Sequence, residues 1–182
     1  NTNIEFIVVE EIQTLEVEKF IGTSINSFFL SLGAAWIFKD DVLKSLFQNR
    51  LLNCHGTRLP NNRGGGGFTW QILMGNRFGF SLIHKVDAGI DTGPIISYEE
   101  FLYPASLRTP KDFEIFYIAK TFTFLTKFIV AARERSLTFD GIKQSEYFSS
   151  YWPRLNSEVN GWINWGWIPA DIDKFICAFD DP

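Results

Sequence analysis

The sequence predicts an α/β fold, in which a sheet with parallel neighbouring strands is flanked by helices. Short β-branched and aromatic runs alternate with short helical segments in the first hundred residues. One of these runs, residues 28–32, is apolar and ends at Gly33, which is typical of a strand buried in a parallel sheet. The 182 residues suit one domain, with or without a short appendage.

The first part of the chain gives the strands and the short helices. Strands are expected at residues 4–9, 28–32, 51–54, 78–86 and 93–98, and helices at 15–21, 40–47 and 68–74. Gly22 is the expected stop signal of the first helix.

The second part begins with a long helix. Thr109, Pro110 and Asp112 provide an N-cap, a first-turn proline and a capping-box acid. No glycine or proline interrupts residues 113–135, where apolar side chains expected to form core against the sheet recur at Phe116, Ala119, Phe122, Leu125 and Ile129. A Trp-, Gly- and Pro-rich stretch follows, and then a short helix at 169–179. We expect residues 1–136 to form the main domain and residues 137–182 an appendage.

Composition and charge narrow the class of protein. The chain is 46% hydrophobic and 21% charged, as in ordinary globular proteins. Its formal charge of −4 argues against a large nucleic-acid interface. Cys54 and Cys177 form no C-x-x-C pair, and this favours a reducing, cytoplasmic setting without a metal site. The first residues do not resemble a signal peptide, and no uninterrupted apolar run has the roughly 18 residues of a membrane span.

Polar residues gather at the end of the strand at 51–54 and in a later turn. Strand alternation places Asn53 and His55 on one face and Cys54 on the other. The run Gly64 to Gly67 permits close backbone approach to a ligand, and Asp87 and Asp91 lie in a turn between strands. Separately, these patterns also fit a structural His–Asn pair, a flexible loop and an ordinary turn. The residues alone therefore indicate an α/β domain with a polar site near His55.

Together, the motifs resemble the folate-dependent formyltransferases, a family that includes methionyl-tRNA formyltransferase, glycinamide ribonucleotide transformylase and the sugar-nucleotide N-formyltransferases. The motifs that carry this resemblance are Asn53-x-His55, Leu59-Pro60, Arg63-Gly64, Trp70-x-Ile72, Gly75 and the run from Asp87-x-Gly89-x-Asp91 to Ile96. The likeness is close over about residues 27–98 and weaker at 161–165 and 170–172. Gly56 and the four-glycine run depart from the usual pattern of the family.

The resemblance implies a Rossmann-like formyltransferase sheet that lacks its first βα units, because no glycine-rich turn precedes Gly22. It implies 10-formyltetrahydrofolate as co-substrate and Asn53, His55 and Asp91 as catalytic residues. Asn53 would donate to the tetrahedral oxyanion, and His55 would carry protons between the amine and the folate nitrogen or stabilise the oxyanion. Asp91 would raise the pKa of His55 and fix its orientation.

The same resemblance predicts the folate pocket. One side would consist of Gly33, Trp36, Ile37 and Phe38, and the other of Val86, Asp87 and Gly89. Without the family, Trp36 and Phe38 fit equally well as core residues. His84 is a candidate for a supporting role, and Cys54 is disfavoured as a nucleophile because it faces away from His55.

The expected acceptor is a primary amine on a small molecule or a sugar nucleotide. Four alternatives stay open: a hydrolase that releases formate from the cofactor, a methionyl-tRNA formyltransferase, a non-catalytic folate-binding module, and an α/β domain for an unrelated ligand. The transfer-RNA reading fits less well with the acidic charge. No membrane partner is expected, and a homodimer is the assembly considered.

Overall fold

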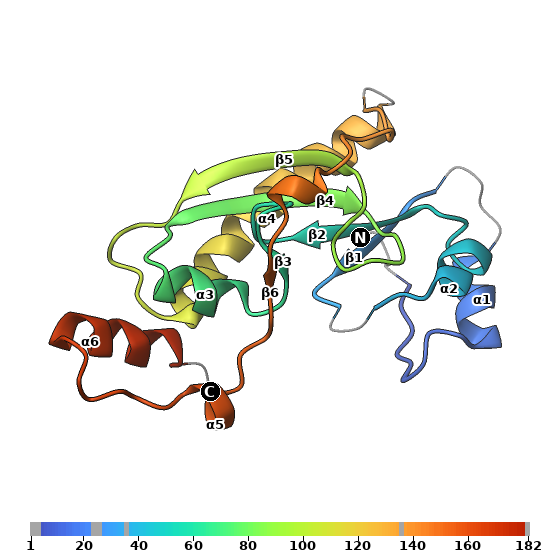
Figure 1. Cartoon of the computed structure of the whole chain (residues 1–182). Coiled ribbons are helices and arrows are strands. Elements are labelled where there is room, and N and C mark those ends of the chain that lie inside the picture. Colours follow the sequence, from blue (N-terminus) through green and yellow to red (C-terminus); the bar gives the residue numbers. More distant parts are fainter. Residues whose placement is uncertain (1–4, 23–26, 35–36, 135–136, 181–182) are drawn as a thin grey trace.

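The computed structural model describes residues 5–22, 27–34, 37–134 and 137–180 (Figure 1). Its helices are α1 (Leu15–Ile21), α2 (Asp40–Ser45), α3 (Gly67–Leu73), α4 (Pro110–Arg133), α5 (Ser157–Asn160) and α6 (Pro169–Ala178), with a 3-10 turn at Glu146–Phe148. Its strands are β1 (Phe29–Leu32), β2 (Leu51–His55), β3 (Arg63–Gly64), β4 (Phe78–Lys85), β5 (Ile95–Leu102) and β6 (Tyr151–Trp152).

Four strands form a mixed sheet in the order β1-β2-β4-β5. Only β1 and β2 are parallel, whereas the β2–β4 and β4–β5 pairs are antiparallel. The prediction of parallel neighbours is therefore wrong for these two pairs. For β4 and β5 the reason is the short link at residues 86–94, because a parallel crossover needs about a dozen residues or more. A small second sheet pairs β3 with β6 in parallel.

Helix α4 runs behind the sheet and covers one of its faces (Figure 1). Phe124 and Phe128 pack on Leu52 of β2 and Ile83 of β4. The predicted N-terminus is confirmed, since Thr109 and Asp112 form a capping box and Pro110 occupies the first turn. The predicted core stripe is wrong at Ala119, which is exposed, and at Phe122 and Ile129, which are 73% and 50% exposed.

The error has a physical cause in the composition of α4, which carries apolar residues on every side, so that periodicity alone does not say which face is buried. By length and composition α4 is also long and apolar enough to cross a membrane. In this fold one face of α4 packs on the sheet, with Phe113, Phe124 and Phe128 each 3% exposed, whereas only 17% of its most apolar 18-residue stretch is buried.

Two further core clusters flank the sheet. One joins α1, α2 and the start of β2, and its centre includes Val17, Leu43 and Leu51. The other brings α3 and α6 together through Ile72 and Ala178. The C-terminal helix therefore packs on the body of the domain, and the division at residue 136 stays a prediction.

Most predicted elements are found within about a turn of their expected bounds. The strand expected at 4–9 is wrong for residues 5–9, where Phe6 and Val8 are 79% and 88% exposed, and Ile4 lies outside the described residues. Strand β1 pairs in parallel as expected but lies at the edge of the sheet, with Leu32 61% exposed, so the expectation of a buried strand is also wrong.

Candidate active site

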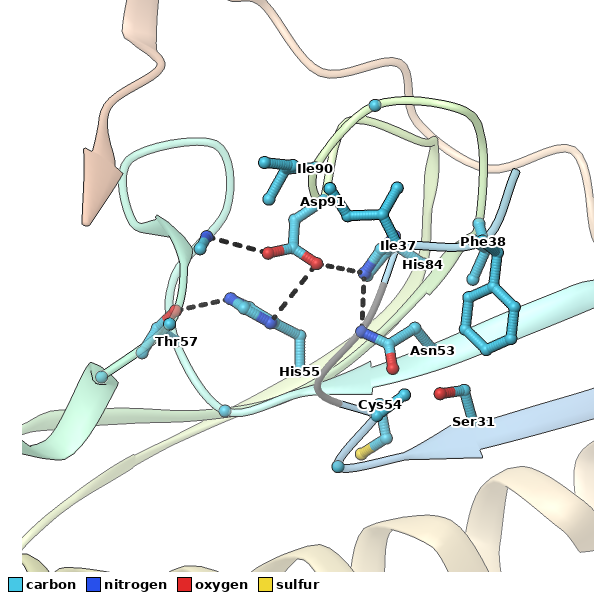
Figure 2. Close-up of a pocket in the computed structure, with 18 of the residues that line it drawn as sticks. Ser31, Ile37, Phe38, Asn53, Cys54, His55, Thr57, His84, Ile90 and Asp91 are labelled. Atoms are coloured by element: carbon cyan, nitrogen blue, oxygen red, sulfur yellow. Dashed lines mark hydrogen bonds and ion pairs between the residues drawn. The ribbon is translucent and has the colours of Figure 1, made fainter. Parts of the chain in front are cut away.

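Strands β2 and β4 place three polar side chains on the face of the sheet opposite α4. Asn53 of β2 lies directly across from His84 of β4, and His55 lies two residues further along β2. The intervening Cys54 points to the other face, where its sulfur lies 3.6 Å from the Tyr117 hydroxyl of α4 (Figure 2). The predicted alternation of Asn53, Cys54 and His55 is confirmed.

Asp91 projects from the β4–β5 loop into this group and lies between the two histidines (Figure 2). Its Oδ1 is 3.7 Å from His55 Nδ1 and 3.4 Å from His84 Nε2. Its Oδ2 accepts a hydrogen bond of 2.9 Å from the backbone N–H of Gly64 in the glycine loop. The structure thus brings together the three residues predicted to be catalytic, with His84 as a fourth.

The neighbours of His55 determine which of its ring nitrogens carries the proton. Thr57 donates its hydroxyl proton to the carbonyl oxygen of Asn62 at 2.7 Å. The oxygen of Thr57 therefore accepts from His55 Nε2, which lies 2.7 Å away. Neutral His55 consequently keeps its proton on Nε2, and the lone pair of Nδ1 faces Asp91.

His84 is 2% exposed and links Asn53 to Asp91. Its Nδ1 lies 2.7 Å from the carbonyl oxygen of Lys85, which can only accept, so Nδ1 carries a proton. Its Nε2 lies 3.2 Å from Asn53 Nδ2. When His84 is neutral, Nε2 accepts from the Asn53 amide, and when it is protonated, Nε2 donates to Asp91.

The surroundings set the charges of the site near neutral pH. Burial lowers the pKa of His55 below its ordinary value, although the Asp91 carboxylate opposes this. Burial by itself would raise the pKa of Asp91, but the hydrogen bond with His84, the charge of His55 and the Gly64 N–H lower it to about 2. The site therefore combines a neutral imidazole base with a carboxylate that stabilises its protonated form.

These side chains open onto a cavity of about 590 Å³. The cavity is lined by every described residue of the predicted folate pocket: Gly33, Ile37, Phe38, Val86, Asp87 and Gly89. Trp36 lies outside the described residues. Phe38 is also part of a core cluster, packed edge-to-face on Phe47, whereas Ile37 is 59% exposed. The folate contacts of these residues stay predictions.

Sequence reasoning missed several residues at this cavity. Thr57 follows His55 by two residues, just beyond the end of β2. Tyr117 also lines the cavity, but it comes from α4, which no local pattern connects to His55. Tyr151 and Arg154 line the cavity from the segment after α4. The ligand atoms of His55, His84 and Asp91 lie within 4.8 Å of one another, a spacing that a metal ion could also use, and the expectation of no metal stays a prediction.

No protein-family model matches the sequence. Among curated proteins, GDP-perosamine N-formyltransferase of Brucella melitensis is 28% identical over 134 residues, which cover 72% of this chain and 48% of that protein. Methionyl-tRNA formyltransferase of Clostridium perfringens is 25% identical over 125 residues, covering 69% of this chain and 39% of that protein.

Among solved structures, an N-formyltransferase from Helicobacter canadensis in complex with folinic acid and dTDP-3-aminofucose is 28% identical, with a TM-score of 0.68. The match covers 84% of this chain and 54% of that one. The resemblance to formyltransferases and the Rossmann-like fold with flanking helices are thereby confirmed. The chain spans about half the length of these relatives, or less.

Proposed function

We propose that this chain takes part in transferring a formyl group from 10-formyltetrahydrofolate to the primary amine of a sugar nucleotide. The observation that carries the proposal is the convergence of Asn53, His55 and Asp91 at one cavity, although they lie on a strand and a distant loop. The relatives support the chemistry, since their names describe N-formyl transfer and the Helicobacter canadensis structure holds a formylated folate.

The reaction needs a proton acceptor, an oxyanion donor and a proton for the leaving nitrogen. The amine attacks the formyl carbon and gives a tetrahedral oxyanion. His55 takes the proton that the amine loses, and the resulting imidazolium is stabilised by Asp91, whose Oδ1 lies 3.7 Å from His55 Nδ1. The bond from the formyl carbon to folate N10 then breaks, and the same proton passes to N10.

Asn53 has the donor capacity that the oxyanion requires. Its amide carries two N–H groups, one of which can bind neutral His84. The other can donate to the oxyanion, and donors aimed at developing charge contribute about 3–4 kcal/mol in known enzymes. When His84 is neutral it therefore holds the Asn53 amide in position, and the Asp91 carboxylate is left to His55.

Calorimetric titration with 5-formyltetrahydrofolate, followed by an assay of formyl transfer to dTDP- and GDP-linked amino sugars, tests the proposal. His55→Ala should remove turnover and keep folate binding, because the imidazole supplies chemistry rather than the pocket. Cys54→Ser is the matched control, since the neighbouring side chain faces α4. A folded chain that binds no reduced folate would sink the proposal.

The assay products also separate the remaining alternatives. Formate released without an acceptor amine indicates the hydrolase. Folate binding with no turnover, unaffected by His55→Ala, indicates a non-catalytic module. Formylation of charged initiator tRNA in place of amino sugars would mean that the acceptor is methionyl-tRNA, as in the name of the Clostridium perfringens relative.

A further inference from the structure

The segment after α4 returns to the catalytic loop and contacts it through Gln144. Ile142 and Ile95 exchange two backbone hydrogen bonds of 2.7 and 2.9 Å, which fix this segment beside the start of β5. From there, Gln144 Nε2 donates to the carbonyl oxygens of Asp91 at 2.8 Å and Gly93 at 2.7 Å. Both N–H groups of one side chain therefore hold the turn that contains Asp91.

Arg63 connects Gln144 to the glycine loop. Its guanidinium donates to Gln144 Oε1 from Nε at 3.2 Å and from Nη2 at 3.0 Å. Its side chain is 7% exposed and also forms two hydrogen bonds of 2.9 Å with Glu146. The next residue, Gly64, binds the Asp91 carboxylate through its backbone N–H. Arg63 thus connects the two partners of Asp91: Gln144, which binds its backbone carbonyl, and Gly64, which binds its carboxylate.

The conformation of Asp91 shows what these contacts hold. Its φ of 52° lies in the left-handed region, which non-glycine residues occupy only where the surroundings fix them. Gly64, at φ 96°, lets β3 and β6 lie close together, because a Cβ there would lie 2.5 Å from the carbonyl oxygen of Trp152. The contacts that hold this backbone conformation therefore help to set where the Asp91 carboxylate lies.

We propose that Gln144 and Arg63 form a clamp that positions the Asp91 carboxylate against His55, so that the segment after α4 controls the reactivity of the site. Neither residue touches the reacting atoms in this scheme, and both act through Asp91. The role in turnover rests on the proposed formyl transfer, whereas the clamp itself is a property of the fold.

Gln144→Met tests the clamp, because methionine has a similar size and no charge but cannot donate to the two carbonyls. The measurement is hydrogen exchange of the Gly64 N–H, which reports directly on the Asp91 carboxylate. We expect roughly tenfold faster exchange, the change that about one net hydrogen bond produces. The Arg63 N–H, which binds the carbonyl of Ser150 at 3.0 Å, should keep its protection.

Two controls separate positioning from general loosening. Gln71→Met makes the same substitution at another buried glutamine, which holds the carbonyl of Phe78 at 2.6 Å, and should leave Gly64 protected. Asp91→Asn should directly accelerate hydrogen exchange of the Gly64 N–H, because it weakens the group that accepts this hydrogen bond. If Gln144→Met accelerates exchange of the Gly64 and Arg63 N–H groups equally, Gln144 merely anchors the segment after α4. Unchanged exchange of the Gly64 N–H would also overturn the clamp.

A second readout links the clamp to the site without using turnover. The Asp91 carboxylate raises the pKa of His55, so its displacement in Gln144→Met should lower the His55 pKa measured by NMR titration, in the same direction as Asp91→Asn. A lowered pKa with no formyl transfer by the wild-type chain would keep the clamp and reject the proposed function. A His55 titration that Asp91→Asn shifts and Gln144→Met does not would reject the clamp alone.

Discussion

The two faces of the sheet differ in the surroundings of their side chains, although the same two strands, β2 and β4, contribute to both. Toward α4, Leu52 and Ile83 are 2% and 0% exposed and pack against phenylalanines. Toward the cavity, their sequence neighbours Asn53 and His84 contact each other, and His84 also contacts Asp91. Because strand side chains alternate, one residue step separates a side chain in the core from one that lines the cavity. Substitutions on the two faces should therefore have separable effects.

The largest separation is expected for His55→Ala on the cavity face. Loss of the general base should lower kcat by about 10²–10⁴-fold, with little change in the free energy of unfolding. Steady-state kinetics beside urea denaturation would show both quantities. An unfolding free energy that falls as much as that of a core variant would contradict the division between the faces.

The α4 face should show the reverse pattern, and it also tests which side of α4 is buried. Phe124→Ala should lower the free energy of unfolding by about 3–5 kcal/mol, because Phe124 is 3% exposed in the core. Phe122→Ala, two residues away and 73% exposed, should change it by less than about 0.5 kcal/mol. Urea denaturation of the pair gives the comparison, and equal losses would mean that α4 buries the other face.

The difference between Phe122 and Phe124 also shows where sequence reasoning stops. The grouping of Asn53, His55 and Asp91 at one cavity could be predicted because Asn53 and His55 follow one strand alternation and Asp91 belongs to a motif shared with a family. The buried face of α4 could not, since its apolar residues surround the helix and only the sheet selects among them. Strand direction and the Gln144 contact depend on long-range packing that no local pattern records.

A smaller effect is expected from the hydroxyl that orients His55. Thr57→Val keeps the shape of the side chain but removes the oxygen that accepts from His55 Nε2. The loss of one hydrogen bond should lower kcat by about tenfold and leave folate affinity nearly unchanged. Thr57→Ser, which keeps the oxygen, should retain most of the activity. A serine variant as weak as the valine variant would show that the methyl group matters and the hydroxyl does not.

The smallest effect concerns pH, and its sign follows from burial. The folded-state pKa of His55 lies below its ordinary value of 6.5, so His55 stays neutral and active somewhat below that pH. Activity should then fall on an acid limb whose midpoint lies below 6.5, and Asp91→Asn should move this limb to still lower pH. Since the folded state resists protonating this imidazole, the contribution of His55 to stability should also decline as the pH falls below 6.5. Activity profiles with NMR titration of the ring measure both, and a midpoint above 6.5 would mean that the Asp91 carboxylate outweighs burial in setting the charge of the base.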